Sequence, residues 1–363
     1  MKTNKKRNLW LILLIAFFTV FGAMTVAAKD YKGKRIRLII PFKEGGGTDT
    51  WGRFYAEQFS RGLPGEPVVS VFNIPGGGSV KGANQFQSRA RKDGLTLLGA
   101  SASTQFPYIL GDPRVRYDYK TWSIVLATPT GGVVYLKPEL GVLSAFDLAK
   151  LDGKELRFGS QGALSMDLVA LIAFDMLDLN IKPVFGMKGR GSGRLAFERG
   201  ETQIDYQTTS AFLKKVMPLV KEGQAVPAFT WGVMDQNGKM HRDPTFPELP
   251  HFSEVYERLK GEKPSGIQYE SWKSLYLAGF AVQKGIYLPR KVSDDIKSTW
   301  VTTARNLINE PGFKQKSEKV LGVYDQYVGE TAEKFVKEAT EMSDSHKNWI
   351  LDWLKKQYNI GFK

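Results

Sequence analysis

The sequence of 363 residues contains no cysteine and only three histidines, His241, His251 and His346. A chain without cysteine has no disulfide, no thiolate metal site and no lipid-modified cysteine. None of the three histidines has a partner at metal-ligand spacing, so a zinc site is not expected. We therefore expect neither a metal nor another cofactor.

Motifs of several enzyme classes are also missing. The segment Gly159–Gly162 reads Gly-Ser-Gln-Gly and is not the G-x-S-x-G motif of α/β-hydrolases. The glycines Gly45–Gly47 lack the Gly-Lys-Ser/Thr ending of a nucleotide-binding P-loop and do not match G-x-G-x-x-G. Asp49, Asp167 and Asp205 could act as acid and base, but such residues more often cap helices or accept hydrogen bonds at strand ends. We predict no catalytic residue and a protein that is not an enzyme, with an exported enzyme as the alternative.

Acidic residues are outnumbered: 37 aspartates and glutamates face 51 lysines and arginines, for a formal net charge of +14. The basic residues are scattered along the chain rather than grouped in one stripe. We therefore expect no nucleic-acid partner and only a mild attraction for anions or acidic headgroups.

The first 28 residues have the three regions of a secretory signal peptide. A basic segment at residues 2–7 precedes the apolar run Leu9–Gly22, and Val26–Ala28 supply the small residues that a signal peptidase accepts. We predict a signal peptide over residues 1–28, cleavage after Ala28 and a mature protein in the periplasm. An uncleaved N-terminal anchor is the alternative, and no other stretch is apolar enough to cross a membrane.

The segment 35–53 combines a strand, a glycine loop and a helix. Residues 35–40 alternate and then become apolar, which predicts a strand that ends at Pro41. Gly45–Gly47 free the backbone, and Thr48 and Asp49 are good N-cap types for the helix that follows. Such a unit directs free N–H groups and a positive helix end at one spot, which suits a carboxylate, phosphate or sulfate. The alternative is a simple βα turn whose glycines only shape the loop.

The rest of the chain alternates strands with helices, which predicts parallel sheets with ligands beyond the carboxyl ends of the strands. A second glycine loop at 76–79 opens a helix, and Ser165 is expected to cap another. Thr130–Gly132 form a plausible hinge. Residues 231–263 are expected to form a long surface excursion, 272–281 a strand, and 289–358 three helical stretches. The other predicted strands are 68–71, 95–100, 124–127, 156–159, 183–185, 204–207 and 226–230.

Several of these motifs occur together in one known family. The sequence resembles the substrate-binding proteins of tripartite tricarboxylate transporters, the TctC/Bug family. The similarity spans nearly all of the mature chain in the right order, through Ile40–Phe42 with Gly45–Asp49, Asn73–Gly78, Asp93–Leu98, Arg157–Gly162, Glu248–Glu254 and Asn309–Phe313.

The resemblance implies an α/β protein with two lobes, a type II-like Venus-flytrap periplasmic binding protein with crossover strands between the lobes. Lobe 1 is expected at 29–127 and 266–363, and lobe 2 at 128–265. The family captures a small organic anion, usually a carboxylate, and delivers it to integral membrane subunits of the transporter. A monomer is expected, and a ligand-binding co-receptor for a sensor kinase is a further alternative.

The resemblance also implies a set of ligand-binding residues, carried on loops of both lobes. They are Phe42, Gly45, Gly46, Gly47, Thr48, Asp49, Ser101, Ser103, Thr104, Ser160, Gly162, Ser165, Lys188 and Thr208. The sequence departs from the family at 163–167, where Ala163, Leu164, Ser165, Met166 and Asp167 replace mostly polar residues, and at Thr209, near which an aspartate is missing. The pocket is therefore expected to be less polar or to take a ligand other than a simple di- or tricarboxylate. Asp167 is expected to face solvent rather than a ligand amine.

Overall fold

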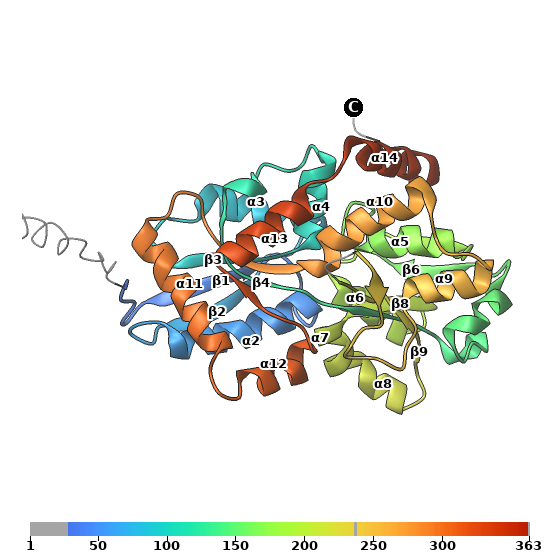
Figure 1. Cartoon of the computed structure of the whole chain (residues 1–363), viewed down its shortest axis with the longest axis horizontal. Coiled ribbons are helices and arrows are strands. Elements are labelled where there is room, and N and C mark those ends of the chain that lie inside the picture. Colours follow the sequence, from blue (N-terminus) through green and yellow to red (C-terminus); the bar gives the residue numbers. More distant parts are fainter. Residues whose placement is uncertain (1–27, 236–237, 362–363) are drawn as a thin grey trace, which may run out of the picture.

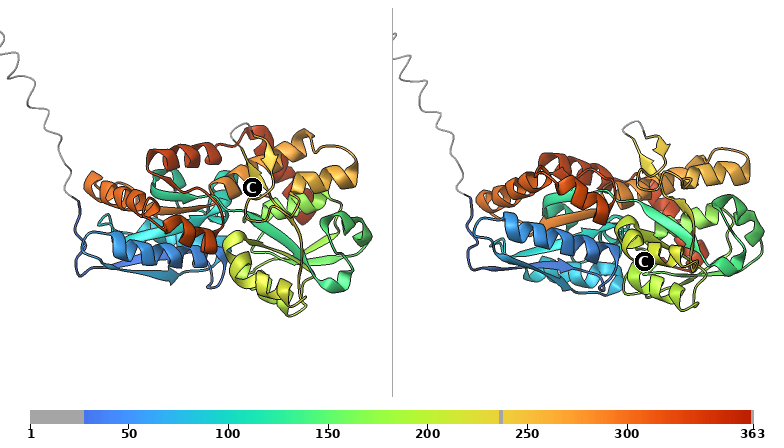
Figure 2. Two further views of the ribbon diagram at one scale, coloured as in Figure 1. Left: turned by 60° about the horizontal axis from the view of Figure 1, so that its bottom comes forward. Right: turned by 90° about the horizontal axis from the view of Figure 1, so that it is seen from below.

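The computed structural model describes residues 28–235 and 238–361. The expected signal peptide lies outside this part of the chain, apart from Ala28. Among the described residues, no helix has both the length and the apolar character needed to span a bilayer. The chain forms two lobes that lie side by side along the long axis of the molecule (Figures 1 and 2).

The first lobe is built on a six-stranded sheet in the order β13-β4-β12-β3-β1-β2. Strand β1 pairs in parallel with β2 and β3, whereas β12 runs antiparallel to β3 and β4. The strands are β1 Arg35–Ile40, β2 Val68–Asn73, β3 Thr96–Ser101, β4 Ser123–Thr128, β12 Lys284–Leu288 and β13 Tyr327–Val328.

Helices cover both faces of this sheet, so β1 buries side chains on both of its faces. Ile36, Leu38 and Ile40 pack into one hydrophobic cluster with Trp51 of α2. Ile39 packs into a second cluster on the opposite face. Such two-sided burial is typical of parallel strands. The helices of this lobe are α2 Gly47–Gly62, α3 Val80–Arg89, α4 Ala102–Leu110, α11 Asp294–Ile308, α12 Phe313–Leu321 and α13 Glu330–Thr340.

The second lobe contains a five-stranded sheet in the order β7-β6-β8-β5-β9. Its strands are β5 Gly132–Leu136, β6 Leu156–Gly159, β7 Ile181–Val184, β8 Ile204–Thr208 and β9 Val226–Thr230. A short hairpin of β10 Val233–Met234 and β11 Met240–His241 projects from it (Figure 2). The helices on this side are α5 Asp167–Met176, α6 Arg190–Glu198, α7 Thr209–Ala211, α8 Met217–Lys221, α9 Phe252–Lys260, α10 Gly266–Tyr276 and α14 Asp344–Tyr358.

The chain crosses between the two sheets at residues 129–131, after β4, and again at 282–283, before β12. The predicted two-lobed α/β class with crossover segments is therefore confirmed. Later in the chain, α14 packs on α10, and α10 packs on α5 beside the five-stranded sheet (Figure 1). The division into lobes after residues 127 and 265 stays a prediction.

Three predictions of local structure were wrong. Residues 272–281 form no strand: α10 continues into a π-helical turn at Leu277–Ala281, and the strand is β12, three residues later. Trp272, Leu275 and Tyr276 recur at helical spacing and are buried, but an apolar run of this length is ambiguous without its neighbours. The surface excursion contains α9 and the hairpin, and the described residues after 289 form four helices instead of three.

Candidate functional site

The amino end of α2 forms the floor of the candidate site. Gly46 is its N-cap residue, so the prediction that Thr48 or Asp49 caps the helix was wrong. Asp49 instead lies in the first turn, where its carboxylate accepts hydrogen bonds from the Gly45 N–H at 3.0 Å and from Asn73 Nδ2 at 3.0 Å. Arg53 Nε also donates to Asp49, at 3.1 Å. The loop is thereby tied to the helix, and the first N–H groups of α2 have no partner within the helix.

Loops of the second lobe close directly over this helix end. The Lys43 N–H donates to the Lys188 carbonyl at 3.0 Å, and Ser210 Oγ donates to the Gly47 carbonyl at 3.2 Å. A Cβ atom on Gly47 would lie 1.8 Å from Thr208 Oγ1, so only glycine permits this approach. The two lobes are therefore in contact at the predicted site.

A small cavity of about 20 Å³ remains between the two lobes at this contact. Seven predicted residues line it: Phe42, Gly46, Gly47, Thr48, Ser101, Ser103 and Thr208. Two buried atoms in its wall, Thr208 Oγ1 and Gln283 Oε1, have no hydrogen-bond partner among the described residues. The volume is close to that of a single water molecule. An organic anion can enter only if the lobes move apart.

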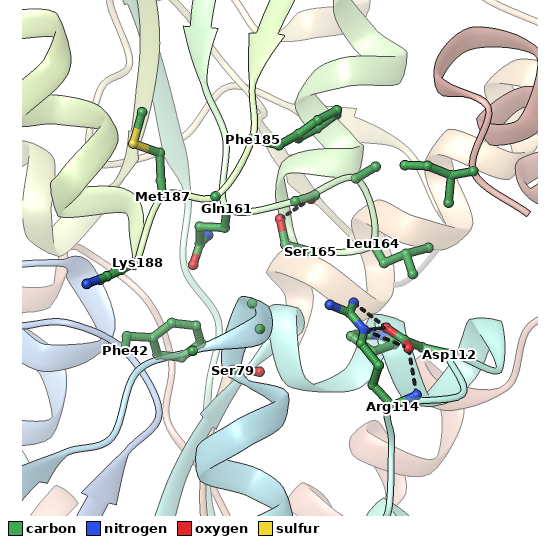
Figure 3. A pocket seen from close by; sticks show the side chains of 18 of the residues that line it. Phe42, Ser79, Asp112, Arg114, Gln161, Leu164, Ser165, Phe185, Met187 and Lys188 are labelled. Carbon is green, nitrogen blue, oxygen red and sulfur yellow. Dashed lines mark hydrogen bonds and ion pairs between the residues drawn. The ribbon is translucent and has the colours of Figure 1, made fainter.

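A second cavity, of about 560 Å³, adjoins the first and shares Phe42 and Gln161 with it (Figure 3). Its walls come from the Gly76–Ser79 loop of the first lobe, the 161–165 and 185–188 loops of the second, and the chain just after α14. The predicted residues Gly162, Ser165 and Lys188 lie here.

Four predicted residues line neither cavity and instead support the loops. Gly45 and Asp49 hold the α2 turn. Thr104 Oγ1 accepts hydrogen bonds from Ser79 Oγ at 3.1 Å and from the Ser101 N–H at 3.4 Å. Ser160 Oγ donates to Asp167 Oδ2 at 3.0 Å. The role of the predicted set in ligand binding stays a prediction.

Behind the site lies a buried charge cluster centred on Arg190. Its guanidinium pairs with Asp205 and, at 3.3 Å, with Asp167, and it donates to the Gly159 carbonyl at 2.6 Å. Asp167 is fully buried and also accepts from Tyr206 OH at 2.7 Å, so the expectation that it faces solvent was wrong. Burial raises the pKa of Tyr206 well above its usual value, and the negative charge of Asp167 is the second largest cause of this increase.

Ser165 lies two residues before α5, and its Oγ accepts from the Asp167 N–H at 3.2 Å. The N-cap residue of α5 is Met166, so the prediction that Ser165 caps this helix was wrong by one residue. The Met166 N–H in turn donates to Ser103 Oγ of the first lobe at 3.0 Å. This loop therefore joins the start of α5 to the opposite lobe.

Sequence reasoning missed Gln161, Arg190, Gln283 and Lys284. Lys284 begins β12, pairs in register with Ser101 on one side and Thr128 on the other, and is 1 % exposed. Burial lowers the pKa of its amine to about 7 and is the one cause of the shift, so no described carboxylate offsets the loss of hydration. The sequence predicted a strand at 272–281 and none at 284–288, so Lys284 was not recognised as a buried strand residue. Among the described residues, no group of three or more His, Cys, Asp or Glu side chains could hold a metal ion.

Two curated relatives from Bordetella pertussis match parts of the chain, while no protein-family model matches it. Protein BugT is 38% identical over 95 residues, which cover 26% of this chain and 28% of that protein. A UPF0065 protein is 30% identical over 196 residues, which cover 52% of this chain and 59% of that protein. The chain thus spans between about a quarter and three fifths of the length of these relatives.

Solved structures match over a larger part of the chain. The periplasmic binding protein BugD has a TM-score of 0.67 at 17% identity and covers 90% of this chain and 98% of its own. MatC from Rhodopseudomonas palustris, with bound malate, has a TM-score of 0.64 at 16% identity, covering 87% and 99%. R. palustris Rpa4515, with adipate, has a TM-score of 0.68 at 17% identity, covering 92% and 99%. At these identities the likeness concerns the fold.

Proposed function

We propose that this chain, whose resemblance to the TctC/Bug solute-binding proteins is confirmed by its sequence relatives, is a periplasmic receptor for a small organic carboxylate. It delivers this ligand to integral membrane subunits of a tripartite tricarboxylate-type transporter. It acts as a binding protein without catalysing a reaction. The signal peptide predicted at residues 1–28 directs it to the periplasm, and cleavage after Ala28 releases it from the membrane.

The observation that carries the proposal is the α2 amino end with lobe 2 closed over it. A carboxylate there accepts hydrogen bonds from the first N–H groups of α2, which lie at the positive end of the helix dipole. Charge-assisted hydrogen bonds contribute about 1.5–3 kcal/mol each. Among the described residues, Thr208 Oγ1 and Gln283 Oε1 are buried and have no hydrogen-bond partner. The Thr208 hydroxyl can donate to the ligand carboxylate, and Gln283 Oε1 can accept from an ordered water beside it. The malate and adipate in the related structures support an organic acid as the ligand.

The receptor mechanism is an opening and closing of the two lobes about the segments that cross between them. In the open form the α2 end is accessible to the ligand. Closure then brings the 160–165 loop and Gly189–Arg190 over the ligand and excludes water, which strengthens every electrostatic contact inside. Asp49 and the Arg190 cluster keep both sides of the site in place before the ligand arrives.

Native mass spectrometry of protein purified without denaturation is the direct test of this function. We expect a co-purified organic acid, and calorimetric binding of at least one member of a panel containing malate, adipate, succinate, octanoate and 3-phenylpropionate. Absence of binding to every carboxylate would refute the receptor proposal. Turnover of a bound carboxylate by the isolated protein would favour the exported enzyme. Intact uptake with lost signalling after gene deletion would favour the sensor co-receptor.

Gly47 and Gly46 provide a matched pair of variants for the site. Gly47→Ala places a Cβ against Thr208 Oγ1 and should lower the affinity for the ligand at least tenfold by preventing closure. Gly46→Ala is the control, because its Cβ would lie 3.5 Å from the Gly191 N atom, an ordinary contact. Equal affinities of the two variants would mean that the ligand binds away from the α2 end.

A further inference from the structure

The 560 Å³ cavity is far larger than the space at the α2 end, and its walls are mainly apolar side chains and glycine backbone. Phe42, Leu164, Phe185, Met187 and Ile360 contribute to it. Pockets of this size usually hold a ligand with a substantial apolar body, oriented by a few polar groups. A four-carbon dicarboxylate would leave most of the space unfilled.

The polar groups around this cavity are largely engaged with the protein itself. Ser79 Oγ donates to the Ser103 carbonyl at 2.9 Å, and Ser165 Oγ donates to the Gly162 carbonyl at 2.6 Å. Arg114 forms an ion pair with Asp112 at 2.5 Å, so its charge is offset. This part of the cavity therefore offers little to compensate a second carboxylate for its lost hydration.

The remaining cation stands at one end of the cavity. Figure 3 shows Lys188 beside Phe42 on one side, with Leu164 and the Arg114–Asp112 pair on the other. Within the described part of the chain Lys188 forms no ion pair. Its backbone carbonyl binds the loop that leads into α2. One end of the cavity is thus suited to an anionic head and the rest to an apolar body.

From this arrangement we propose that the ligand is a monocarboxylate with a bulky apolar body, aromatic or medium-chain aliphatic. Its carboxylate lies between Lys188 and the α2 end, and its body lies against Phe42, Leu164 and Phe185. This inference rests on the proposed receptor function and narrows its ligand class. Ala163 and Leu164 both line the cavity and add to the apolar wall on which the body lies.

The test compares 3-phenylpropionate and octanoate with succinate and adipate by titration calorimetry on the full mature protein. We expect at least one apolar-bodied acid to bind tenfold or more tightly than succinate. Tighter binding of the dicarboxylates would overturn this inference and leave the receptor function intact. If none of the four acids nor malate binds, the receptor function and this inference both fail.

The variant Leu164→Asn tests whether the apolar body of the ligand lies in this cavity. This variant should bind the tighter-binding apolar-bodied acid at least tenfold more weakly, while its affinity for succinate changes little. Leu143→Asn is the control, because Leu143 is 79% exposed and lines no part of the cavity. Leu164→Met, which retains an apolar wall, should keep the affinity and thus separates loss of apolar contact from a folding defect. An unchanged affinity in Leu164→Asn would overturn the assignment.

Discussion

Lys284 provides a prediction whose magnitude follows from its surroundings. The amine is buried with a pKa of about 7, against an ordinary value of 10.5. The difference of about 3.5 units corresponds to about 5 kcal/mol at about 1.36 kcal/mol per unit. Below pH 7 the lysine is charged in both the folded and unfolded states, and burying the charged amine lowers the free energy of unfolding by this full amount.

The sign of the pH dependence follows from the proton count. Between pH 7 and 10.5 the unfolded state binds more protons at this site than the folded state, so the stability should rise with pH. Above 10.5 the amine is neutral in both states and the cost is gone. On α2, the Asp49 carboxylate accepts from Arg53 Nε, and Tyr55 OH donates to Gln326. The neighbouring strands present Ser101 and Thr128, which do not titrate in this range.

The perturbation is Lys284→Met, which keeps the length of the side chain and removes its charge. The variant should be more stable than the wild type by up to about 5 kcal/mol at pH 6, and the gain should shrink steadily between pH 7 and pH 10. Urea unfolding followed by tryptophan fluorescence at pH 6, 7, 8 and 9 measures this, with the exposed Lys92→Met as control. Parallel pH profiles for wild type and Lys284→Met would refute the reasoning.

Three further predictions concern other parts of the structure. Arg190→Met leaves two buried carboxylates without their cation and should lower the free energy of unfolding by about 3–5 kcal/mol. A free energy of unfolding from thermal denaturation within about 1 kcal/mol of the wild-type value would contradict this. Asp49→Ala removes the acceptor of the Gly45 N–H and should cost about 1–3 kcal/mol and weaken ligand binding, measured by urea unfolding and calorimetry; unaltered stability and affinity would show that the loop holds itself. N-terminal sequencing of protein released by osmotic shock should begin at Lys29, and protein that still begins at Met1 in washed membranes would exclude cleavage after Ala28.

The βα unit at the start of the mature chain could be predicted closely because its signals are local. The alternation in 35–40, the proline and the three glycines each restrict the backbone of their own segment. The cap residue was missed: the N-cap is Gly46, two positions before Thr48 and three before Asp49, and Asp49 instead accepts a hydrogen bond from the Gly45 N–H. Turn chemistry of this kind depends on how the loop folds back, and several residue types fit more than one position.

The segment 272–288 shows where local signals are insufficient. Its apolar residues suit a buried helix and a buried strand equally. The first part of the segment is helical because α10 packs between α5 and α14. Asp167 shows the same limit for a single side chain. An aspartate in a first helical turn is usually exposed, but here Arg190, from a different helix, pairs with it inside the lobe.

The sequence by itself determined the alternation of strands and helices, the glycine loop at α2 and the resemblance to a receptor family, because each depends on neighbours in the chain. Only the tertiary structure decided that lobe 2 closes on Gly47, that Lys284 is buried, and that an apolar cavity lies beside the small one. These features join residues more than a hundred positions apart, such as Gly47 with Thr208 and Ser101 with Lys284. Burial and electrostatic pairing at such contacts arise from packing, which no local pattern encodes.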